Sequence, residues 1–243
     1  MATTGKPNRT NEAQTSAGSG SSPLFILAVV AVIVLGLAAL AIVATSGGDD
    51  TEAAEDTSIG ADAGAAEDEA AETAAVTVDG DAIAAMERGV QVIDTAGQGG
   101  VGMIAPTLTG TSFDGSDVSI GADGRPKVVY FLAHWCPHCQ REVPAVMDLI
   151  EAGSQPEGLD IYAVSTAVDD EAPNYPPSDW LAGEGVTFPV LRDDAASSAL
   201  AAYGPSGFPY AVYLDGDNRV IAQSAGELDA ATTEQLWIAT AAG

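Results

Sequence analysis

The chain has 243 residues, 35 of them acidic and 8 basic, and its formal net charge is −27. Binding to nucleic acid needs clustered lysine and arginine side chains that contact phosphates, so this composition argues against nucleic acid as a partner. Apolar residues make up 47% of the chain, which is enough for one sizeable domain with appendages.

The N-terminal segment predicts a tail followed by a membrane span. Residues 1–23 are rich in Thr, Ser, Gly and Asn without apolar periodicity, which predicts a disordered tail. Residues 24–43 (LFILAVVAVIVLGLAALAIV) carry no charge, and a helix of this length spans roughly 30 Å, the thickness of a bilayer's hydrocarbon core. Lys6 and Arg9 precede this helix and acidic residues follow it, so the positive-inside rule predicts a cytoplasmic N-terminus.

A cleavable signal peptide is the alternative for the same apolar run. Ala39 and Ala41 would supply an A-x-A cleavage site, but that site falls inside the run. The run is also longer than the apolar region of an ordinary signal peptide. A retained, single-pass anchor in the cell membrane is therefore the favoured interpretation, and it predicts that the C-terminal bulk of the chain lies outside the cytoplasm.

Residues 44–75 predict an acidic, disordered linker between the membrane and a folded domain. The stretch 47–75 holds ten Asp or Glu residues and neither Lys nor Arg, so its charges repel one another and extend the chain. A short acidic helix in the Ala- and Glu-rich part is the alternative, and neither interpretation implies chemistry. An extracytoplasmic domain is expected over residues 76–243, with its core at about 105–241.

The folded part alternates apolar strands with amphipathic helices. Residues 81–97 (DAIAAMERGVQVIDTAG) predict a first helix, with Ile83, Met86, Val90 and Ile93 on one face. Further strands are predicted at 118–121, 127–133, 159–165, 210–214 and 219–224, and helices at 137–151, 193–203 and 229–241. The turn sequence LDGDN makes the last two strands a hairpin. A parallel βαβ start, a hairpin and a closing helix predict an α/β fold, with helices flanking a central mixed β-sheet.

Both cysteines lie in the stretch VVYFLAHWCPHCQREVPAVMDLI, where a predicted buried strand passes into a predicted helix. Cys136 falls at the helix start, where unpaired N–H groups and the helix dipole stabilise a thiolate. Pro137 suits a first helical turn, and the ring of His138 adds positive charge near the sulfur. We therefore expect Pro137 and His138 to tune how readily Cys136 ionises. Cys136 is the expected catalytic thiol that attacks and leaves, and Cys139, one turn along, is the expected catalytic thiol that resolves a mixed disulfide.

Two other interpretations of these residues stay open. One is a structural disulfide, although a bridge over two intervening residues constrains little chain. The other is a metal site with ligands drawn from His134, Cys136, His138 and Cys139. The spacing lacks the second ligand pair of a structural zinc site, so no metal is predicted. Trp135 either packs against the fold or presents its ring to a substrate.

The sequence around these cysteines resembles the thioredoxin-like thiol–disulfide oxidoreductases, and among them the membrane-anchored TlpA/ResA-type group. The similarity runs from APTLTGTSFDGSDVSI at 105–120 to about residue 240, and it includes the W-C-x-x-C motif and Pro144, eight residues after Cys136. It implies a thioredoxin-like fold and an enzyme that exchanges a Cys136–Cys139 disulfide or dithiol with exported proteins. Whether a membrane redox partner recycles the pair stays open.

The segment YGPSGFPYAVYLD at 203–215 belongs to the same resemblance. In the family it carries a cis-proline opposite the active disulfide, and Pro209 matches that proline, with Pro205 as the weaker candidate. Phe208 would be the preceding residue, whose backbone pairs with an extended substrate. The expected substrate-binding residues are thus Trp135, Phe208 and Pro209. An X–Pro bond before a strand is also a place where a cis peptide can occur.

The dipeptide between the cysteines departs from the family's usual pattern. TlpA/ResA-type reductases resemble W-C-x-P-C, whereas Pro-His is the dipeptide of DsbA-type oxidases, so the leaving-group argument leans towards disulfide formation or exchange over reduction. The chain lacks the long helical insertion of DsbA proteins and has a proline-rich loop with a short helix at 165–185. A reductant for cytochrome c maturation, a copper-handling protein and a non-catalytic thioredoxin-fold adapter are the alternatives. No organic cofactor is expected, because the chain has neither a G-x-G-x-x-G after a strand nor a Walker lysine.

Overall fold

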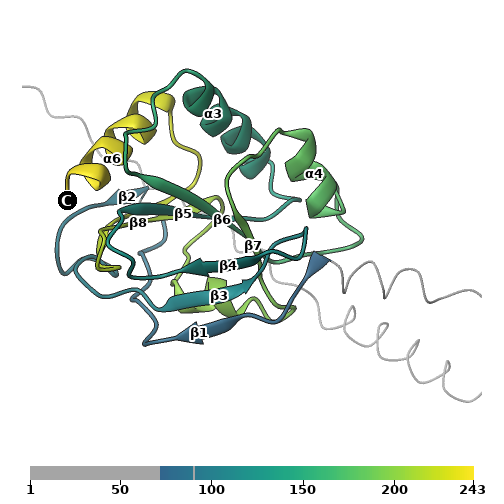
Figure 1. The fold of residues 1–243 in the computed structure, drawn as a ribbon, viewed down its shortest axis with the longest axis horizontal. Helices are drawn as coiled ribbons and strands as arrows, with labels where there is room; N and C mark the ends of the chain where they lie inside the picture. The colour runs from purple at the N-terminus through teal and green to yellow at the C-terminus, as the bar shows by residue number, and fades with distance from the viewer. Residues whose placement is uncertain (1–71, 90) are drawn as a thin grey trace, which may run out of the picture. The chain divides into compact units, whose positions relative to one another are not determined.

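The structure is a computed structural model that describes residues 72–89 and 91–243 (Figure 1). The predicted tail, the predicted membrane span and most of the predicted linker lie outside these residues. Among the residues that are described, no helix is both long enough and apolar enough to span a bilayer. The last residues of the predicted linker contact the domain, since the Glu72 carboxylate accepts hydrogen bonds from the backbone N–H and hydroxyl of Ser178 at 2.9 and 2.7 Å.

Strands and helices alternate along the described part of the chain. The strands are β1 (Thr77–Asp79), β2 (Val92–Ile93), β3 (Thr107–Thr111), β4 (Asp117–Ile120), β5 (Lys127–Leu132), β6 (Asp160–Ser165), β7 (Val190–Arg192), β8 (Tyr210–Leu214) and β9 (Val220–Ala225). The helices are α3 (Cys139–Glu151), α4 (Pro177–Gly183), α5 (Ser198–Ala202) and α6 (Ala230–Ala242). Every element predicted from residue 118 onwards is present, and all but α5 have ends within one or two residues of the prediction.

Six strands form the central sheet, in the order β2-β9-β8-β5-β6-β7. Strands β5, β6 and β7 run parallel to one another, whereas β8, β9 and β2 continue the sheet by antiparallel pairing. The parallel β5–α3–β6 unit and the β8–β9 hairpin are the connections that the sequence predicts, so the mixed sheet is confirmed. A second sheet of three antiparallel strands, in the order β1-β3-β4, is not part of the prediction.

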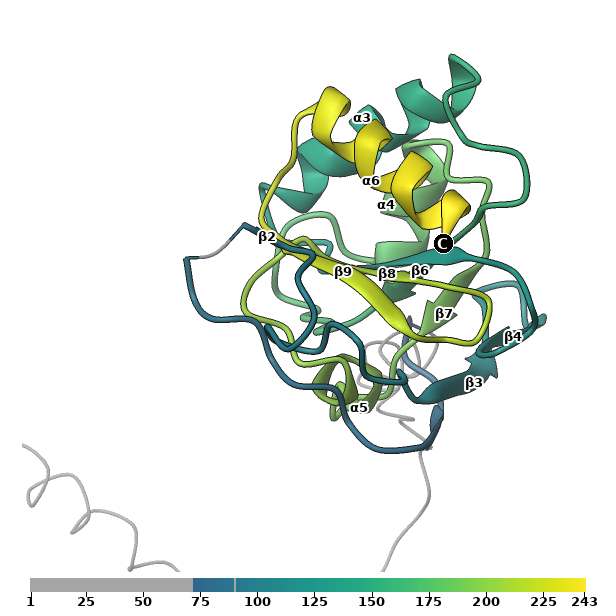
Figure 2. The same ribbon diagram turned by 90° about the vertical axis from the view of Figure 1, so that its left-hand side faces the viewer.

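Both faces of the central sheet are covered. Figure 2 shows α3, α4 and α6 on one face and α5 with the three-stranded sheet on the other, in agreement with Figure 1. The indole Nε1 of Trp237 on α6 donates to the Tyr130 hydroxyl on β5 at 3.0 Å. That hydrogen bond lets a large aromatic side chain be buried without leaving its polar atom unpaired.

Strand β5 (KVVYFL) separates two apolar clusters. All its residues are buried, and successive side chains of a strand point to opposite faces. Val129 and Phe131 belong to the cluster on the α5 side, whereas Val128, Tyr130 and Leu132 belong to the cluster under α3 and α6. A strand that is buried on both faces needs the near-continuous apolar run that this sequence has.

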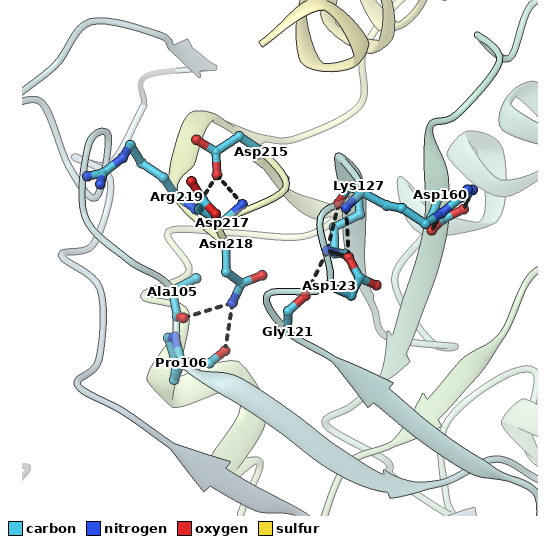
Figure 3. A network of polar contacts seen from close by, with 11 residues as sticks. Ala105, Pro106, Gly121, Asp123, Lys127, Asp160, Asp215, Asp217, Asn218 and Arg219 are labelled. Atoms are coloured by element: carbon cyan, nitrogen blue, oxygen red, sulfur yellow. Dashed lines mark hydrogen bonds and ion pairs between the residues drawn. The ribbon is translucent and has the colours of Figure 1, made fainter.

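A network of charged and polar groups closes the end of the sheet where β5 begins (Figure 3). Lys127 is fully buried there. Its ammonium donates to the Gly121 and Arg125 carbonyls and to Asp123 Oδ1, each at 2.8 Å. A buried ammonium is costly unless it is paired and hydrogen-bonded, and here all three of its protons have acceptors. The Arg125 guanidinium also pairs with Asp160, which ties the starts of β5 and β6 together.

The first predicted helix, over residues 81–97, is wrong. The segment is irregular up to Gly89, and β2 occupies part of its second half. The Ile83 N–H donates to the Ala202 carbonyl on α5, so this backbone is held by a distant element and not by a helix of its own. Gly89 has φ of 82°, a left-handed conformation that interrupts a helix. Ile83 and Met86 are buried all the same, so the apolar spacing identified core contacts and misjudged the local conformation.

Helix α5 is shorter than the predicted helix at 193–203. The Asp193 carboxylate accepts hydrogen bonds from the N–H groups of Ala199 and Leu200 at 2.9 and 3.1 Å. Ser197, the residue before the helix, has φ of 56° and so lies in the left-handed region. The carboxylate satisfies first-turn N–H groups that have no partner inside the helix, and this fixes where the helix starts.

Candidate active site

The two cysteines lie at the junction between β5 and α3. The Cys136 N–H donates to the Ala133 carbonyl at 3.0 Å, and the Gln140 N–H donates to the Cys136 carbonyl at 3.1 Å. Helix α3 begins at Cys139, two residues later than predicted. Cys136 therefore lies just before the first turn, near N–H groups that have no partner inside the helix. Both cysteines are free thiols in this structure.

The two thiols differ in burial. Cys136 is 6% exposed, whereas Cys139 is fully buried in the cluster under α3 and α6. Burial raises the pKa of the Cys139 thiol well above its usual range, and the nearby Cys136 sulfur and Glu142 carboxyl add to the rise. Cys139 is thus protonated at neutral pH, and Cys136 is the sulfur that a disulfide in solution can reach.

His138 lies on the surface beside two charged residues. Its Nδ1 is 2.8 Å from Nη2 of Arg141 and 3.2 Å from Oε2 of Glu227. Arg141 also donates from Nε to the same oxygen of Glu227 at 2.8 Å. Hydrogen bonds from Arg141 and then from His138 hold the pKa of Glu227 below its usual range, so this carboxylate is ionised at neutral pH. The tuning of Cys136 by Pro137 and His138 stays a prediction, to which the structure adds these two neighbours.

Both ring nitrogens of His134 are engaged by the protein. The side chain is buried, with Nδ1 2.9 Å from the Pro173 carbonyl and Nε2 3.2 Å from the Asp169 N–H. Nε2 accepts and Nδ1 donates, so the ring is neutral and fixes the loop after β6 against the cysteine loop. That loop also contains a cis peptide bond, Tyr175–Pro176. Over residues 72–89 and 91–243, no three His, Cys, Asp or Glu side chains are grouped so as to hold a metal ion.

Of the three predicted substrate-binding residues, Phe208 lines a groove, Pro209 follows it, and Trp135 contacts the ring of Phe208. The Phe208–Pro209 peptide bond is cis, as the resemblance implied. The ring of Trp135 meets the ring of Phe208 edge to face, with centroids 5.8 Å apart and an interplanar angle of 84°. Trp135 is half-buried, and its Nε1 donates to the Ala167 carbonyl at 2.7 Å. Phe208 and His138 both line a groove of about 450 Å³.

Glu142 is the part of this site that the sequence patterns miss. It lies three residues after Cys139, on the buried face of α3, and its Oε2 accepts the Leu228 N–H at 3.0 Å. Burial raises the pKa of Glu142 to about 7; the hydrogen bond from Leu228 opposes the rise, and the charge of Glu227 adds to it. A carboxyl with this pKa beside a buried thiol can take up or release a proton near neutral pH. An acidic residue among the apolar positions of α3 is the signal that could have identified it.

Comparisons with known proteins agree with this arrangement. The family model for redoxin matches residues 100–236. The thiol-disulfide oxidoreductase ResA of Bacillus thuringiensis is 26% identical over 137 residues, which cover 56% of this chain and 74% of that protein. The thiol:disulfide interchange protein HelX of Rhodobacter capsulatus is 29% identical over 107 residues, which cover 44% of this chain and 55% of HelX.

A solved structure has the same fold. The solution structure of a candidate protein disulfide isomerase from Bacteroides thetaiotaomicron aligns with a TM-score of 0.51 and 19% identity, over 63% of this chain and 94% of that one. The shared fold is thioredoxin-like, with helices flanking a mixed sheet, and this prediction is confirmed. Because the family match covers more than half of the chain, the protein belongs to the redoxin family and is a thiol–disulfide oxidoreductase.

Proposed function

We propose that this redoxin is a membrane-anchored, extracytoplasmic enzyme that exchanges a Cys136–Cys139 disulfide or dithiol with exported proteins. One observation carries the proposal: two free thiols of unequal burial lie at the start of α3, beside a groove bordered by Phe208 and His138. Cys136 is the attacking and leaving thiol, and Cys139 is the resolving thiol.

The exchange proceeds in two balanced steps. The Cys136 thiolate attacks one sulfur of a substrate disulfide, so that a mixed disulfide forms and the other substrate sulfur leaves as a thiolate. Cys139 then loses its proton and attacks the Cys136 sulfur, and the second substrate sulfur leaves as a thiolate. The substrate gains two electrons, and the Cys136–Cys139 pair loses them. The same steps in reverse transfer the disulfide to a dithiol substrate.

Glu142 is the proton acceptor that the second step requires. The thiol of Cys139 is buried and its pKa is raised, so it does not ionise unaided at neutral pH. Glu142 has a pKa of about 7, which makes it partly ionised and partly protonated at neutral pH. It can therefore accept the proton of Cys139 during resolution and return it when the pair is reduced again.

Activity assays on cysteine variants test the proposal. We expect Cys136→Ser to lower insulin reduction and oxidative refolding to the uncatalysed rate, because no other thiol of the site reaches solvent. Cys139→Ser keeps the attacking thiol, and it should accumulate a mixed disulfide that a reductant releases. Equal activity in the wild type and Cys136→Ser would overturn the assignment.

We further propose that the enzyme forms or exchanges disulfides more readily than it reduces them. Pro137 and His138 support this direction, because a stabilised Cys136 thiolate favours the reduced pair and makes the disulfide a stronger oxidant. Equilibration with glutathione buffers measures the potential. A value near −120 mV would support the oxidising direction, and one near about −270 mV would favour a reductant, such as one for cytochrome c maturation.

The membrane anchor is a proposal from the sequence. An uncharged apolar run at residues 24–43 supports a single span, with residues 1–23 in the cytoplasm and an acidic linker at 44–75 leading to the domain. Protease added to intact cells without an outer membrane should remove the domain and leave a membrane-bound fragment. Recovery of the whole chain in the soluble fraction would contradict the anchor.

A further inference from the structure

Three side chains near the cysteine motif form a cluster, here called the clamp: His138, Arg141 and Glu227. The proposed function gives no role to Arg141 or Glu227. His138 precedes α3, Arg141 lies in the first turn of α3, and Glu227 comes from the loop between β9 and α6, 86 residues after Arg141. Both Nε and Nη2 of Arg141 contact Oε2 of Glu227, at 2.8 and 2.7 Å. Its Nη2 also lies 2.8 Å from Nδ1 of His138.

The clamp holds the Arg141 guanidinium in place. The Nδ1 of His138 lies near both Arg141 Nη2 and Glu227 Oε2, and it can accept from the first only when unprotonated and donate to the second only when protonated. The lasting positive charge of the clamp therefore belongs to Arg141, which stays protonated at every accessible pH. Glu227 holds that cation in place from a different part of the fold and partly neutralises it.

Arg141 lies in the turn that follows the reactive cysteine, since the Gln140 N–H donates to the Cys136 carbonyl at 3.1 Å and the Arg141 N–H donates to the His138 carbonyl at 3.2 Å. The pKa of Arg141 is raised, first by its hydrogen bond to Glu227 and further by the charge of an ionised Cys136. A cation held near a cysteine stabilises its thiolate, and this is the effect that we assign to the guanidinium of Arg141. The carboxylate of Glu227, held against that guanidinium, has the opposite sign and the opposite effect.

We propose that Arg141 and Glu227 are positioning residues that set, together with His138, the stability of the Cys136 thiolate and hence the reduction potential of the Cys136–Cys139 pair. The proposal deepens the proposed function and rests on it. Arg141 favours the reduced pair, and Glu227 limits that preference. Their single neutralisations therefore shift the redox equilibrium in opposite directions.

The test uses the full-length chain, purified in detergent and equilibrated with glutathione buffers at pH 7. We expect Arg141→Gln to shift the dithiol–disulfide equilibrium about three- to tenfold towards the disulfide, and Glu227→Gln to shift it by a similar factor towards the dithiol. A tenfold shift corresponds to about 30 mV for this two-electron couple. The double variant keeps the net charge of the clamp and should lie within about twofold of the wild type.

The fold offers a matched control. Arg125 and Asp160 form a similar pair at the other end of β5, with side-chain exposures of 55% and 24%, against 52% and 35% for Arg141 and Glu227. Arg125→Gln removes the same charge from the protein and should leave the redox equilibrium unchanged. Arg141→Lys, which retains the charge, should restore most of the wild-type equilibrium.

Two results would overturn the clamp. Both single variants could match the wild type, or both could shift in one direction, as a purely structural role would produce. If the wild type exchanges disulfides with glutathione and the variants have the same equilibrium, only the proposed role of the clamp is wrong. If the wild type forms no disulfide with glutathione, both the proposed function and the proposed role of the clamp are wrong.

Discussion

The two ends of β5 carry polar groups that differ in how they hold their protons. At its start, the buried ammonium of Lys127 donates all its protons to fixed oxygens, including a carboxylate oxygen of Asp123 (Figure 3). Beyond its other end, Cys139 and Glu142 are buried and burial raises the pKa of both, so Cys139 keeps its proton at neutral pH while Glu142, with a pKa of about 7, can exchange one. A saturated network holds the fold together, whereas buried groups with exchangeable protons can do chemistry.

The largest expected effect is a difference in alkylation rate between the two thiols that follow the end of β5. We expect Cys136 in the Cys139→Ser variant to be alkylated at least about a thousandfold faster than Cys139 in the Cys136→Ser variant, because Cys139 is buried and largely un-ionised. Iodoacetamide kinetics at pH 7 measure both rates. In concentrated urea the two rates should converge. Similar rates in the folded variants would remove the distinction between attacking and resolving thiols.

The next effect belongs to the start of the strand. Lys127→Met keeps the length of the side chain but leaves the Gly121 and Arg125 carbonyls and the Asp123 carboxylate without their donor. We expect the free energy of unfolding to fall by about 2–4 kcal/mol, because three acceptors lose their donor together while the half-exposed Asp123 carboxylate can still be hydrated. Urea unfolding measures the loss, and the alkylation rate of Cys136 in folded protein should not change. A loss below about 1 kcal/mol would show that water replaces the ammonium.

The strands and helices that position this site could be predicted because their signals are local. Strand β5 is a continuous apolar run, and α3 repeats buried positions at helical spacing, so neither depends on distant residues for recognition. The helix predicted over residues 81–97 is wrong because the apolar spacing there reflects contacts with the core. The backbone N–H of Ile83 donates to the Ala202 carbonyl and not to a helix of its own. The strands β1 and β7 are three residues long, too short to show a period.

The residues of the site also divide into those with local sequence signals and those that depend on distant contacts. The cysteines, Pro137, His138 and the cis-proline Pro209 lie in compact motifs that can be identified from neighbouring residues. Glu227 lies 89 residues from His138, and no spacing rule connects a loop after β9 with the start of α3. Side-chain contacts of this kind follow from the completed fold, so the sequence alone could not assign them.

Glu142 supplies the next prediction, with a sign set by its raised pKa. Its pKa rises from an ordinary 4.5 to about 7 in the folded protein, so its destabilising effect is absent below pH 4.5, grows as the pH rises from 4.5 to 7 and is complete above 7. We expect Glu142→Gln to match the wild type in unfolding free energy near pH 4 and to exceed it by about 3 kcal/mol at pH 8. The amide oxygen can still accept the Leu228 N–H, so the hydrogen bond survives.

A control variant and a kinetic measurement distinguish the effect of Glu142 on stability from a role in proton transfer. Glu151→Gln, at the exposed end of the same helix, should show no such pH-dependent gain. If Glu142 accepts the proton of Cys139, its variant should also resolve mixed disulfides more slowly at pH 7 while alkylation of Cys136 proceeds as before. A stabilised variant with normal resolution would leave Glu142 as a buried acid without a catalytic role.

The smallest effect compares the same substitution, tryptophan to phenylalanine, at two places. Trp135→Phe removes the hydrogen bond from Nε1 to the Ala167 carbonyl beside the cysteines, and Trp237→Phe removes the one to the Tyr130 hydroxyl in the core. Trp135→Phe should lower the free energy of unfolding by about 1 kcal/mol, the usual contribution of one hydrogen bond, and Trp237→Phe should lower it further, because the smaller ring also leaves a cavity in the core. Only Trp135→Phe should also slow exchange with protein substrates, because Trp135 contacts Phe208 at the groove. Equal exchange rates in the two variants would mean that the ring of Trp135 supports the loop and takes no part in substrate binding.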